Sequence, residues 1–462
     1  MFIHLSCVSA FSLKYGTAKP RDLIAKAAEF EMPALALTDR DSLAGVIRFV
    51  SAAKEFGIAP IVGINLALDK HRVTLLAQSD GGWKSLVRLL SALRCERTAP
   101  LLHFEQLKEL SEFTKNLILL HGPESNLAAL IAKSRYDLAL GEFNKYRPFF
   151  ADSYIEAVSH LAPGTGPKSM SHAARSLGFA RDNDLPAIIS NAVRMLHPED
   201  GPVADVLDAA RKLAPLSAKN LERKNGEAHL KTSAAMAALA DEIAIAAGER
   251  NGRQLLRATQ RLAERCILSA AEFGLGGIQL PEAQMVGANS YQELRGLLRQ
   301  KCESQINFYY PDSKDLKVAR LRLDDELATV ATLGYESYFL SVGDVTDMAK
   351  SAGIRVAARG SGAGSLICHL LGISGVDPIK YGLLMERFCS PLRNALPDID
   401  IDVESARRLE IYDLVFKKYK ERTATVAMFE TYRARSAIRD TGSALGLSQF
   451  EIDLLAKRSE EH

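Results

Sequence analysis

Three aspartates in the segment 396–404, which reads LPDIDIDVE, have a spacing that could bind a metal ion. Asp398, Asp400 and Asp402 alternate with three β-branched apolar residues. In a β-strand this alternation places the carboxylates on one face and the apolar side chains on the other. Carboxylates so close together repel one another unless a cation lies between them, and Mg²⁺ prefers such oxygen ligands together with substrate phosphates. A solvated acidic face on an edge strand is the alternative interpretation.

A glycine-rich turn upstream of the acidic segment could hold a phosphate group. The segment 358–373, ARGSGAGSLICHLLGI, follows a strand-like run and opens an apolar helix, so backbone N–H groups and the helix dipole would favour an anion there. The residues that could contribute are Arg359, Gly360, Ser361, Gly362, Gly364 and Ser365. Simple close packing is the alternative explanation for the glycines. A metal-binding strand and a phosphate-binding turn together form the two halves of a nucleotidyl-transfer site.

A basic segment follows the acidic one. Between residues 405 and 440, Lys and Arg outnumber Asp and Glu, although the chain as a whole is nearly neutral. Arg433, Arg435 and Arg439 have helical spacing, and Arg435 and Arg439 would share one face. A solvated helix explains this pattern equally well in isolation, whereas a neighbouring metal and phosphate site favours contact with a nucleic acid backbone.

The elements predicted around these motifs follow an α/β pattern. Apolar runs predict strands at 2–6, 34–39, 59–68, 73–78, 116–122, 154–157 and 186–193, and helical patterns are found at 20–30 and 43–56. This rhythm predicts a largely parallel sheet or barrel in the N-terminal part. Connecting helices are predicted from 201 to 310, a second α/β segment from 315 to 403, and helices from 404 to 462.

The composition indicates an ordinary globular protein. Of 462 residues, 47% are hydrophobic and 25% charged, and the formal charge of +2 produces no general attraction to nucleic acid or membrane. Six scattered cysteines without a Cys-x-x-Cys pair predict reduced thiols rather than disulfides or a zinc site. The N-terminus has neither a basic region nor a sustained apolar stretch, so we expect a cytoplasmic protein that is neither secreted nor inserted in a membrane.

At these motifs the sequence resembles a known family. The run 334–408, which contains ARGSGAGSLICHLLGI and LLMERFCSPLRNALPDIDIDVESARR, closely resembles the palm of the C-family bacterial DNA polymerases, namely the alpha subunit of DNA polymerase III and its error-prone paralogues. The likeness covers residues 334 to about 457. The first 200 residues resemble the polymerase and histidinol phosphatase (PHP) domain that precedes this palm. The segment that reads TDRDSLAGVIRFV is more similar to the error-prone branch of the family than to the main replicase.

The resemblance implies template-directed DNA synthesis, in which dNTPs are added to a primer 3′-end during error-prone repair or replication. It maps the two catalytic, metal-binding aspartates onto Asp400 and Asp402, with Asp398 in a supporting position, and it maps the triphosphate-binding loop onto the glycine-rich turn. Two Mg²⁺ ions are the implied cofactors. The implied partners are primer-template DNA, dNTPs and other polymerase or repair proteins, and no membrane.

Two departures from the family pattern qualify this expectation. An intact PHP domain holds a metal cluster, but the ligand positions that we can match carry Ser6, Val8, Arg40, Asn65, Ala192 and Arg194. These side chains do not replace imidazole and carboxylate ligands, so we expect no PHP-domain metal and no phosphoesterase activity, and a structural role for His4. The family's third catalytic carboxylate, fingers and clamp contact lie further downstream, so we expect them to be absent from this chain and its activity alone to be weak.

The predicted fold class is therefore α/β, with a PHP-like (βα) barrel-type N-terminal domain, a helical connector, a partial polymerase palm and the start of a helical thumb. The corresponding divisions are 1–205, 206–310, 311–404 and 405–462. A DNA polymerase of the error-prone branch is the main hypothesis. The alternative is a truncated, non-catalytic module that binds DNA or another polymerase.

Overall fold

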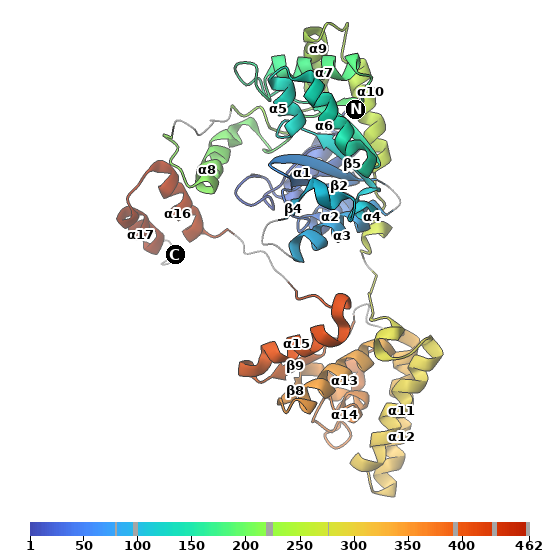
Figure 1. The fold of residues 1–462 in the computed structure, drawn as a ribbon. Helices are drawn as coiled ribbons and strands as arrows, with labels where there is room; N and C mark the ends of the chain where they lie inside the picture. The colour runs from blue at the N-terminus through green and yellow to red at the C-terminus, as the bar shows by residue number, and fades with distance from the viewer. Residues whose placement is uncertain are drawn as a thin grey trace. The chain divides into compact units, whose positions relative to one another are not determined.

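The computed structural model describes residues 1–78, 81–95, 100–218, 225–275, 277–390, 396–426 and 432–458. The chain forms two compact units (Figure 1). Unit 1 comprises Met1–Leu275 together with Phe429–His462, and unit 2 comprises Gly276–Met428.

Unit 1 is built on a seven-stranded sheet. Its strands are β1 (Ala34–Leu37), β2 (Ala59–Leu68), β3 (His71–Ala77), β4 (Leu101–Leu102), β5 (Leu117–His121), β6 (Asp152–Ala157) and β7 (Ala187–Ile189). They follow the order β1-β2-β3-β5-β6-β7, and β4 pairs with β2. Six of the predicted strand positions are thereby confirmed.

The sheet is mixed, because β3 runs antiparallel to both of its neighbours. The pairs β1–β2, β2–β4, β5–β6 and β6–β7 are parallel, as the sequence predicted. The physical reason for the exception is the connection: only Asp69 and Lys70 separate β2 from β3, and so short a turn can join only antiparallel strands.

The predicted strand at residues 2–6 is wrong as a regular strand, although its residues bond to the sheet. The Ala36 N–H donates to the His4 carbonyl at 3.0 Å, and the Val193 N–H donates to the Ser6 carbonyl at 2.8 Å. Only an isolated bridge, Cys7 to Val193, is formed. Because β1 is one end of the strand order and Val193 follows β7 at the other end, this segment bonds to the chain at both ends of the sheet.

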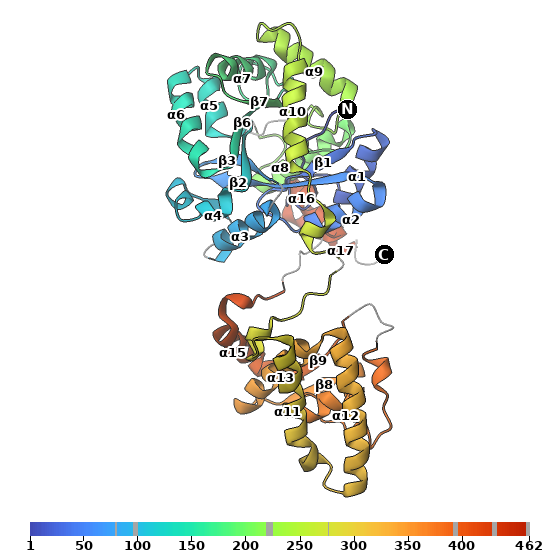
Figure 2. The same ribbon diagram turned by 90° about the vertical axis from the view of Figure 1, so that its right-hand side faces the viewer.

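Helices surround this sheet. They are α1 (Pro20–Glu29), α2 (Val46–Phe56), α3 (Gly82–Cys95), α4 (Ser111–Thr114), α5 (Asn126–Ala132), α6 (Tyr136–Tyr146), α7 (Met170–Asp182), α8 (Gly201–Lys212), α9 (Ser233–Ala246) and α10 (Arg253–Cys266). The predicted helices at 20–30 and 43–56 are confirmed as α1 and α2. Ser125, Ser169 and Thr232 cap α5, α7 and α9 by accepting a backbone hydrogen bond. Helix α10 lies against the sheet beside β7 (Figure 2).

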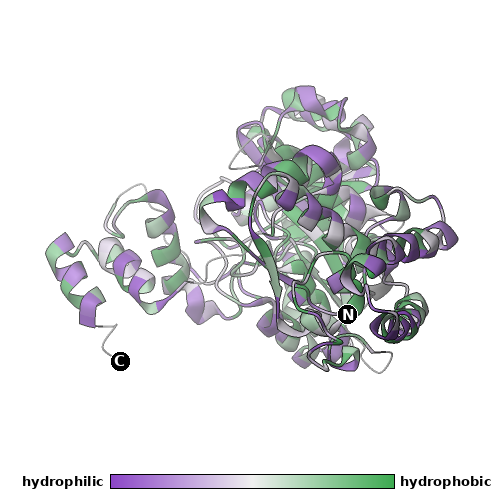
Figure 3. Ribbon diagram, turned by 90° about the horizontal axis from the view of Figure 1, so that it is seen from below, coloured by the Kyte–Doolittle hydropathy of each residue, from purple (hydrophilic) through white to green (hydrophobic). Residues whose placement is uncertain are grey.

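The core of unit 1 lies between the sheet and these helices. All four residues of β1 are buried, and Phe49 of α2 packs into the same cluster as Leu35 and Leu37. Every residue of β1 and β5 is buried, whereas Figure 3 shows hydrophobic and hydrophilic residues mixed along the helices. The sheet is therefore covered by amphipathic helices, as expected of an α/β domain.

Two helices from the end of the chain also belong to unit 1. These are α16 (Ala434–Leu445) and α17 (Gln449–Arg458). Helix α16 packs on α8, where the Leu216 N–H donates to the Ala444 carbonyl at 2.8 Å, and Lys14 pairs with Asp440 at 2.9 Å.

Unit 2 is mainly helical. Its helices are α11 (Tyr291–Tyr309), α12 (Ser313–Leu333), α13 (Glu336–Ser351), α14 (Leu366–Leu370) and α15 (Arg408–Tyr419). A two-stranded antiparallel sheet is formed by β8 (Val356–Arg359) and β9 (Asp400–Val403). The core includes Phe339 and Phe388, whose rings meet edge to face with centroids 6.0 Å apart. The helices position this short sheet and the turn that follows β8.

None of the helices in the described ranges combines the length and the apolar character needed to span a membrane.

Candidate functional sites

The acidic strand lies at the edge of unit 2 with the alternation that its sequence predicts. In β9, Asp400 and Asp402 are exposed, while Ile401 and Val403 are half-buried. Asp398 is also exposed but precedes the strand. The apolar face packs on the helices, so the carboxylates are left on the outer face.

Strand pairing brings the glycine-rich turn directly to these carboxylates. In the antiparallel register, Arg359 lies opposite Asp400, and Ala357 opposite Asp402. The Arg359 Nε lies 3.1 Å from Asp402 Oδ1. Gly360 has a φ of +75°, and a Cβ built on it would lie 3.8 Å from Asp400 Oδ2. The turn and the acidic strand therefore form one continuous site.

A buried carboxylate that sequence reasoning missed holds the turn in place. Glu326 of α12 is 3% exposed and accepts hydrogen bonds from the Ser365 hydroxyl at 3.0 Å, the Leu366 N–H at 2.9 Å and the Ile367 N–H at 3.1 Å. Ser365 is fully buried and also caps α14. The first N–H groups of α14 are thus already bonded to protein. No local signal marks Glu326, because its partners lie in a distant part of the sequence.

The end of the turn is equally constrained. Arg322 donates to the Gly364 carbonyl at 2.7 Å and to the Leu383 carbonyl at 2.8 Å, and it also pairs with Glu326 at 2.9 Å. A Cβ on Gly364 would lie only 2.7 Å from the Leu384 carbonyl oxygen, so a larger residue does not fit there.

A cavity of about 580 Å³ borders this turn. It is lined by Gly360, Ser361, Ala363, Gly364, Leu383, Leu384 and Arg387. Arg387 adds a cationic side chain that the sequence pattern alone did not single out. Gly362 is buried beneath the turn, 3.8 Å from the Phe388 ring when a Cβ is built on it.

The three arginines of the basic segment lie in unit 1, whereas the acidic strand lies in unit 2. Arg433 precedes α16, and Arg435 and Arg439 lie on it; all three are exposed. Arg439 pairs with Asp453 of α17 at 2.9 Å. The basic segment and the acidic strand therefore belong to different units.

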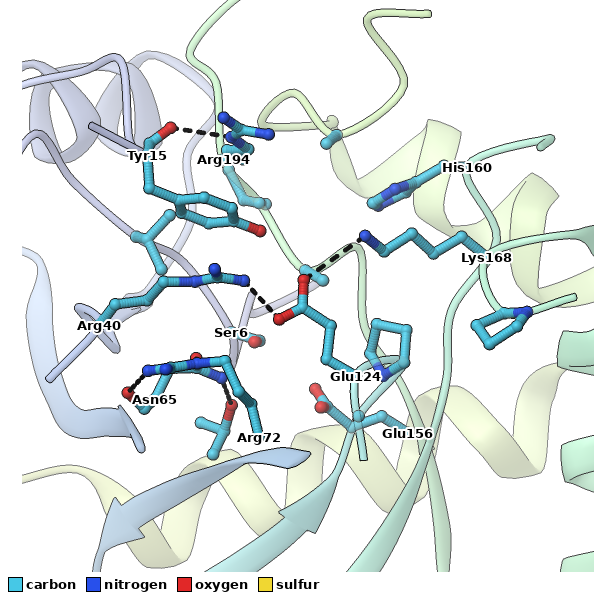
Figure 4. A pocket seen from close by; sticks show the side chains of 18 of the residues that line it. Ser6, Tyr15, Arg40, Asn65, Arg72, Glu124, Glu156, His160, Lys168 and Arg194 are labelled. Carbon is cyan, nitrogen blue, oxygen red and sulfur yellow. Dashed lines mark hydrogen bonds and ion pairs between the residues drawn. The ribbon is translucent and has the colours of Figure 1, made fainter. Parts of the chain in front are cut away.

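The six positions at which the resemblance places lost PHP ligands line one cavity of unit 1. This cavity of about 510 Å³ includes Ser6, Val8, Arg40, Asn65, Ala192 and Arg194 (Figure 4). They come from the N-terminal segment, the chain after β1, strand β2 and the chain after β7. Segments far apart in the sequence thus converge at the rim of the sheet.

An ion-pair network occupies part of this cavity. The Arg40 guanidinium lies 2.5 Å from Glu124 Oε2, and Lys168 Nζ lies 3.7 Å from Glu124 Oε1. Arg72 pairs with Asp41 at 2.9 Å. Burial would raise the pKa of the Glu124 carboxyl, but Arg40 and Lys168 outweigh that effect and lower it to about 2. Glu124 is therefore ionised among several cations.

Arg194 anchors the opposite wall. It donates to the Tyr15 carbonyl at 2.8 Å and forms a bidentate pair with Asp208 at 2.8 and 2.9 Å. The guanidiniums of Arg40 and Arg194 lie 3.3 and 4.0 Å from the centroid of the Tyr15 ring. Cation–π contacts of this kind fix both arginine side chains.

Glu156 reaches the cavity from β6 (Figure 4). It is 4% exposed, and among the described residues neither of its carboxylate oxygens has a hydrogen-bond partner of normal geometry. Burial raises its pKa to about 7, and the Ser190 hydroxyl offsets only part of that rise. A Cβ on Gly122 would lie 2.5 Å from Glu156 Oε2, so the glycine makes room for this carboxyl.

The donor set of this cavity does not fit a metal cluster. The matched positions offer two guanidiniums and small or apolar side chains, and the carboxylate of Glu124 is taken by Arg40 and Lys168. Cations so close would repel a metal ion. In the described ranges, one group of His, Asp and Glu has its ligand atoms within 4.8 Å of one another, namely Asp69, His103 and Glu105, and none of these is a matched PHP position.

His4 lies outside the cavity lining. It is buried, its Nε2 lies 2.9 Å from the Lys231 carbonyl, and burial lowers its pKa to about 4. A neutral imidazole held against a backbone carbonyl is consistent with the structural role expected for it.

Comparisons with known proteins find two family matches in this chain. The PHP domain family matches residues 4–160, and the family described as bacterial DNA polymerase III alpha NTPase domain matches residues 296–462. The chain is 34% identical to an error-prone DNA polymerase of Symbiobacterium thermophilum, covering all of this chain and 42% of that protein. A second error-prone DNA polymerase, from Methylococcus capsulatus, is also 34% identical, with 100% and 41% covered.

The chain thus spans about two-fifths of the length of the curated relatives it matches. Among solved structures, an amidohydrolase from Chromobacterium violaceum, determined with bound sulfate and no metal, is 15% identical with a TM-score of 0.29. That match covers 42% of this chain and 88% of the other.

Proposed function

Because this chain belongs to the C-family of bacterial DNA polymerases, on its error-prone branch, we propose that its acidic strand takes part in template-directed DNA synthesis. The reaction is the transfer of a nucleotide from a dNTP to a primer 3′-end. The observation that carries the proposal is the register between β8 and β9, which places Arg359 and Gly360 beside Asp400 and Asp402. A site for a metal-bound triphosphate needs this combination of carboxylates and phosphate donors.

Asp400 and Asp402 are the proposed catalytic carboxylates, and Asp398 is a supporting acid just before the strand. Their oxygens suit Mg²⁺, which when bound would neutralise charge on the phosphates and the attacking hydroxyl. The exposure of both side chains leaves them accessible to a substrate. Arg359 then has a second role, since it offsets the carboxylate charge in the absence of substrate.

The turn is the proposed binding site for the dNTP phosphates. Arg359, Gly360 and Ser361 are exposed beside the carboxylates, and Gly364 borders the same cavity. Gly362 and Ser365 are buried, so we propose that they shape the turn rather than contact the phosphates from the surface. Glu326 would position the turn through Ser365 and the first N–H groups of α14.

The activity belongs to the whole protein in this proposal, because the chain spans about two-fifths of its relatives. We propose primer-template DNA and dNTPs as substrates and error-prone repair or replication as the setting. The division into segments 1–205, 206–310, 311–404 and 405–462 stays a prediction.

The test is Mg²⁺-dependent primer extension by a protein that carries this chain at the length of its relatives. Asp400→Asn and Asp402→Asn should each lower extension by at least about 100-fold, since each removes a charged metal ligand, while primer-template affinity stays within about twofold. Asp413→Asn, which changes an exposed aspartate on α15, is the matched control. Normal extension by both variants would contradict the assignment, and wild-type binding without extension would select the non-catalytic alternative.

The basic segment is proposed to contact the DNA backbone through Arg433, Arg435 and Arg439. Arg435→Ala should weaken DNA binding and reduce the slope of log affinity against log salt by about one, because one phosphate contact is lost. Titrations of labelled DNA at several salt concentrations measure this slope. An unaltered slope would make α16 a solvated helix without a DNA contact.

A further inference from the structure

The cavity of unit 1 retains the features of a ligand site although it does not fit a metal cluster. We propose that it binds the phosphate group of a small phosphorylated molecule, with arginine and lysine side chains in place of metal ions, and that it does not hydrolyse this ligand. The proposal concerns unit 1 alone and is independent of DNA synthesis by unit 2.

The side chains that line the cavity carry more positive than negative charge. Four cationic side chains line the cavity, namely Arg40, Arg72, Lys168 and Arg194. Three carboxylates pair with them: Asp41 with Arg72, Asp208 with Arg194, and Glu124 with both Arg40 and Lys168. Glu124 is ionised and shared between Arg40 and Lys168. Because burial raises the pKa of Glu156 to about 7, this carboxyl is only partly ionised at neutral pH and does not cancel the remaining positive charge fully. A surplus of positive charge in a partly enclosed cavity attracts an anion.

The cavity also contains buried polar atoms whose hydrogen-bonding capacity is not satisfied by the described residues. The Nε of Arg40 is buried and, among the described residues, has no hydrogen-bond acceptor. The two oxygens of Glu156 are also buried, and among the described residues neither has a partner of normal hydrogen-bond geometry, because the contact with the Ser190 hydroxyl falls short of it. Leaving such groups unpaired is unfavourable, so a native protein normally satisfies them. A ligand that accepts a hydrogen bond from Arg40 Nε and forms a second hydrogen bond with the Glu156 carboxyl group would satisfy both side chains.

These two orphan groups define the ligand's chemistry. Arg40 requires an acceptor oxygen that carries negative charge, while Glu156 requires a hydroxyl, an amino group or a protonated phosphate oxygen. A phosphate group has oxygens of both kinds, and planar guanidinium matches its geometry. The volume of about 510 Å³ lies in the range of small-molecule sites and admits a phosphorylated molecule as large as a mononucleotide.

The side chains are held ready rather than free to collapse. The Arg40 guanidinium rests on the Tyr15 ring, and Arg72 is fixed by Asn65 Oδ1 at 2.7 Å and by Asp41 at 2.9 Å. Gly122 leaves the space that the Glu156 carboxyl fills. Figure 4 shows Arg40, Glu124, Lys168 and Glu156 converging on one cavity. A preorganised site binds its ligand at a lower entropic cost than a flexible surface.

The same residues explain why binding would not lead to hydrolysis. Hydrolysis of a phosphate ester in this kind of site needs a water activated by metal ions, and protein ligands must hold those ions. The matched positions offer Ser6, Val8 and Ala192 instead of such ligands. His160 has its Nε2 at 2.7 Å from the Asn191 carbonyl, so that nitrogen is not turned to the cavity as a base. Guanidinium and ammonium groups hold a phosphate without lowering the pKa of a water.

The test uses the complete 462-residue chain in EDTA. Isothermal titration with dAMP and with inorganic phosphate should show saturable binding to one site, and adenosine should bind at least about tenfold more weakly than dAMP. The same samples should release no phosphate from dAMP. Adenosine binding as tightly as dAMP, a requirement for added metal, or phosphate release would each overturn the proposal. Absence of saturable binding by both phosphate probes would also overturn it.

Variants locate the binding in this cavity. Arg40→Met and Lys168→Met should each weaken dAMP binding by at least about tenfold. Arg21→Met is the matched control, because it removes an exposed arginine that pairs with Glu55 on the surface of the same unit, and its affinity should equal that of the wild type. Ala162→Phe fills the cavity without a change of charge and should abolish binding even if Arg40→Met fails to fold. Wild-type affinity in Lys168→Met and Ala162→Phe would overturn the proposal.

Discussion

The cavity of unit 1 and the acidic strand of unit 2 use the same residue types in opposite ways. In the cavity wall, Arg194 and Asp208 form an ion pair whose side chains are 4% and 5% exposed. At the strand, Arg359 and Asp402 form a pair whose side chains are 66% and 64% exposed. The first pair is locked by burial, while water competes with the second. Burial therefore separates a structural ion pair from one that a substrate can replace.

The largest expected effect is at the buried pair. Arg194→Met leaves the buried Asp208 carboxylate without its main partner and should lower the free energy of unfolding of unit 1 by about 3–5 kcal/mol. Urea denaturation followed by fluorescence measures this, because Trp83 is the single tryptophan of the chain and packs in unit 1. A loss below about 1 kcal/mol would mean that Arg211, which also pairs with Asp208, suffices alone.

Glu156 sharpens the comparison through pH. Its pKa is raised from 4.5 to about 7, so the folded state holds a proton that the unfolded state has released between these values. The contribution of this group to the free energy of unfolding is fully present below about pH 4.5 and is lost as the pH rises to about 7. The total loss is about 3 kcal/mol. Glu156→Gln stays neutral and should therefore exceed the wild type in relative stability at pH 8.

The measurement compares wild type and Glu156→Gln by urea denaturation at pH 4.5 and pH 8, again through Trp83. The difference between the two proteins should change by about 3 kcal/mol between these pH values. A difference that is independent of pH would show that Glu156 is ionised in the folded state throughout.

The buried carboxylate of unit 2 should respond more moderately. Glu326→Gln keeps the size of the side chain but can no longer accept from the Ser365 hydroxyl and both N–H groups of α14. We expect a loss of about 2 kcal/mol in unit 2 and faster hydrogen exchange at residues 360–370, measured by mass spectrometry. Glu303→Gln, an exposed partner of Arg299, is the control and should change stability by less than about 0.5 kcal/mol. Equal exchange in both variants would remove Glu326 from the support of the turn.

The smallest effect is expected at the exposed pair. Arg359→Met should alter the stability of unit 2 by less than about 1 kcal/mol, since water already solvates both partners. Hydrogen exchange over residues 356–403 provides the measurement. A change as large as that of Arg194→Met would erase the contrast between the two regions and assign Arg359 a structural role.

The sequence predicted the features that depend on neighbouring residues, and it missed the contacts between residues that lie far apart in the chain. The alternation at Asp400–Val403 and the glycine-rich turn were readable because period and composition act over a few residues. The resemblance pointed to six positions that prove to line one cavity. Glu326 could not be recognised, because its hydrogen bonds to the turn link residues about forty positions apart. The irregular pairing of residues 2–6 escaped for a similar reason, since its partners lie in β1 and near Val193.

The pairing of β8 with β9 also limits how this region can change during evolution. The two strands share four residue pairs, from Val356 with Val403 to Arg359 with Asp400. One inserted residue in either strand would turn the carboxylates toward the packed face, because side chains alternate with a period of two. The connection between the strands is free of that rule. Among related sequences we therefore expect insertions and deletions to accumulate in the connection after Leu370, and to be absent from the strands and from the turn that Glu326 and Arg322 hold.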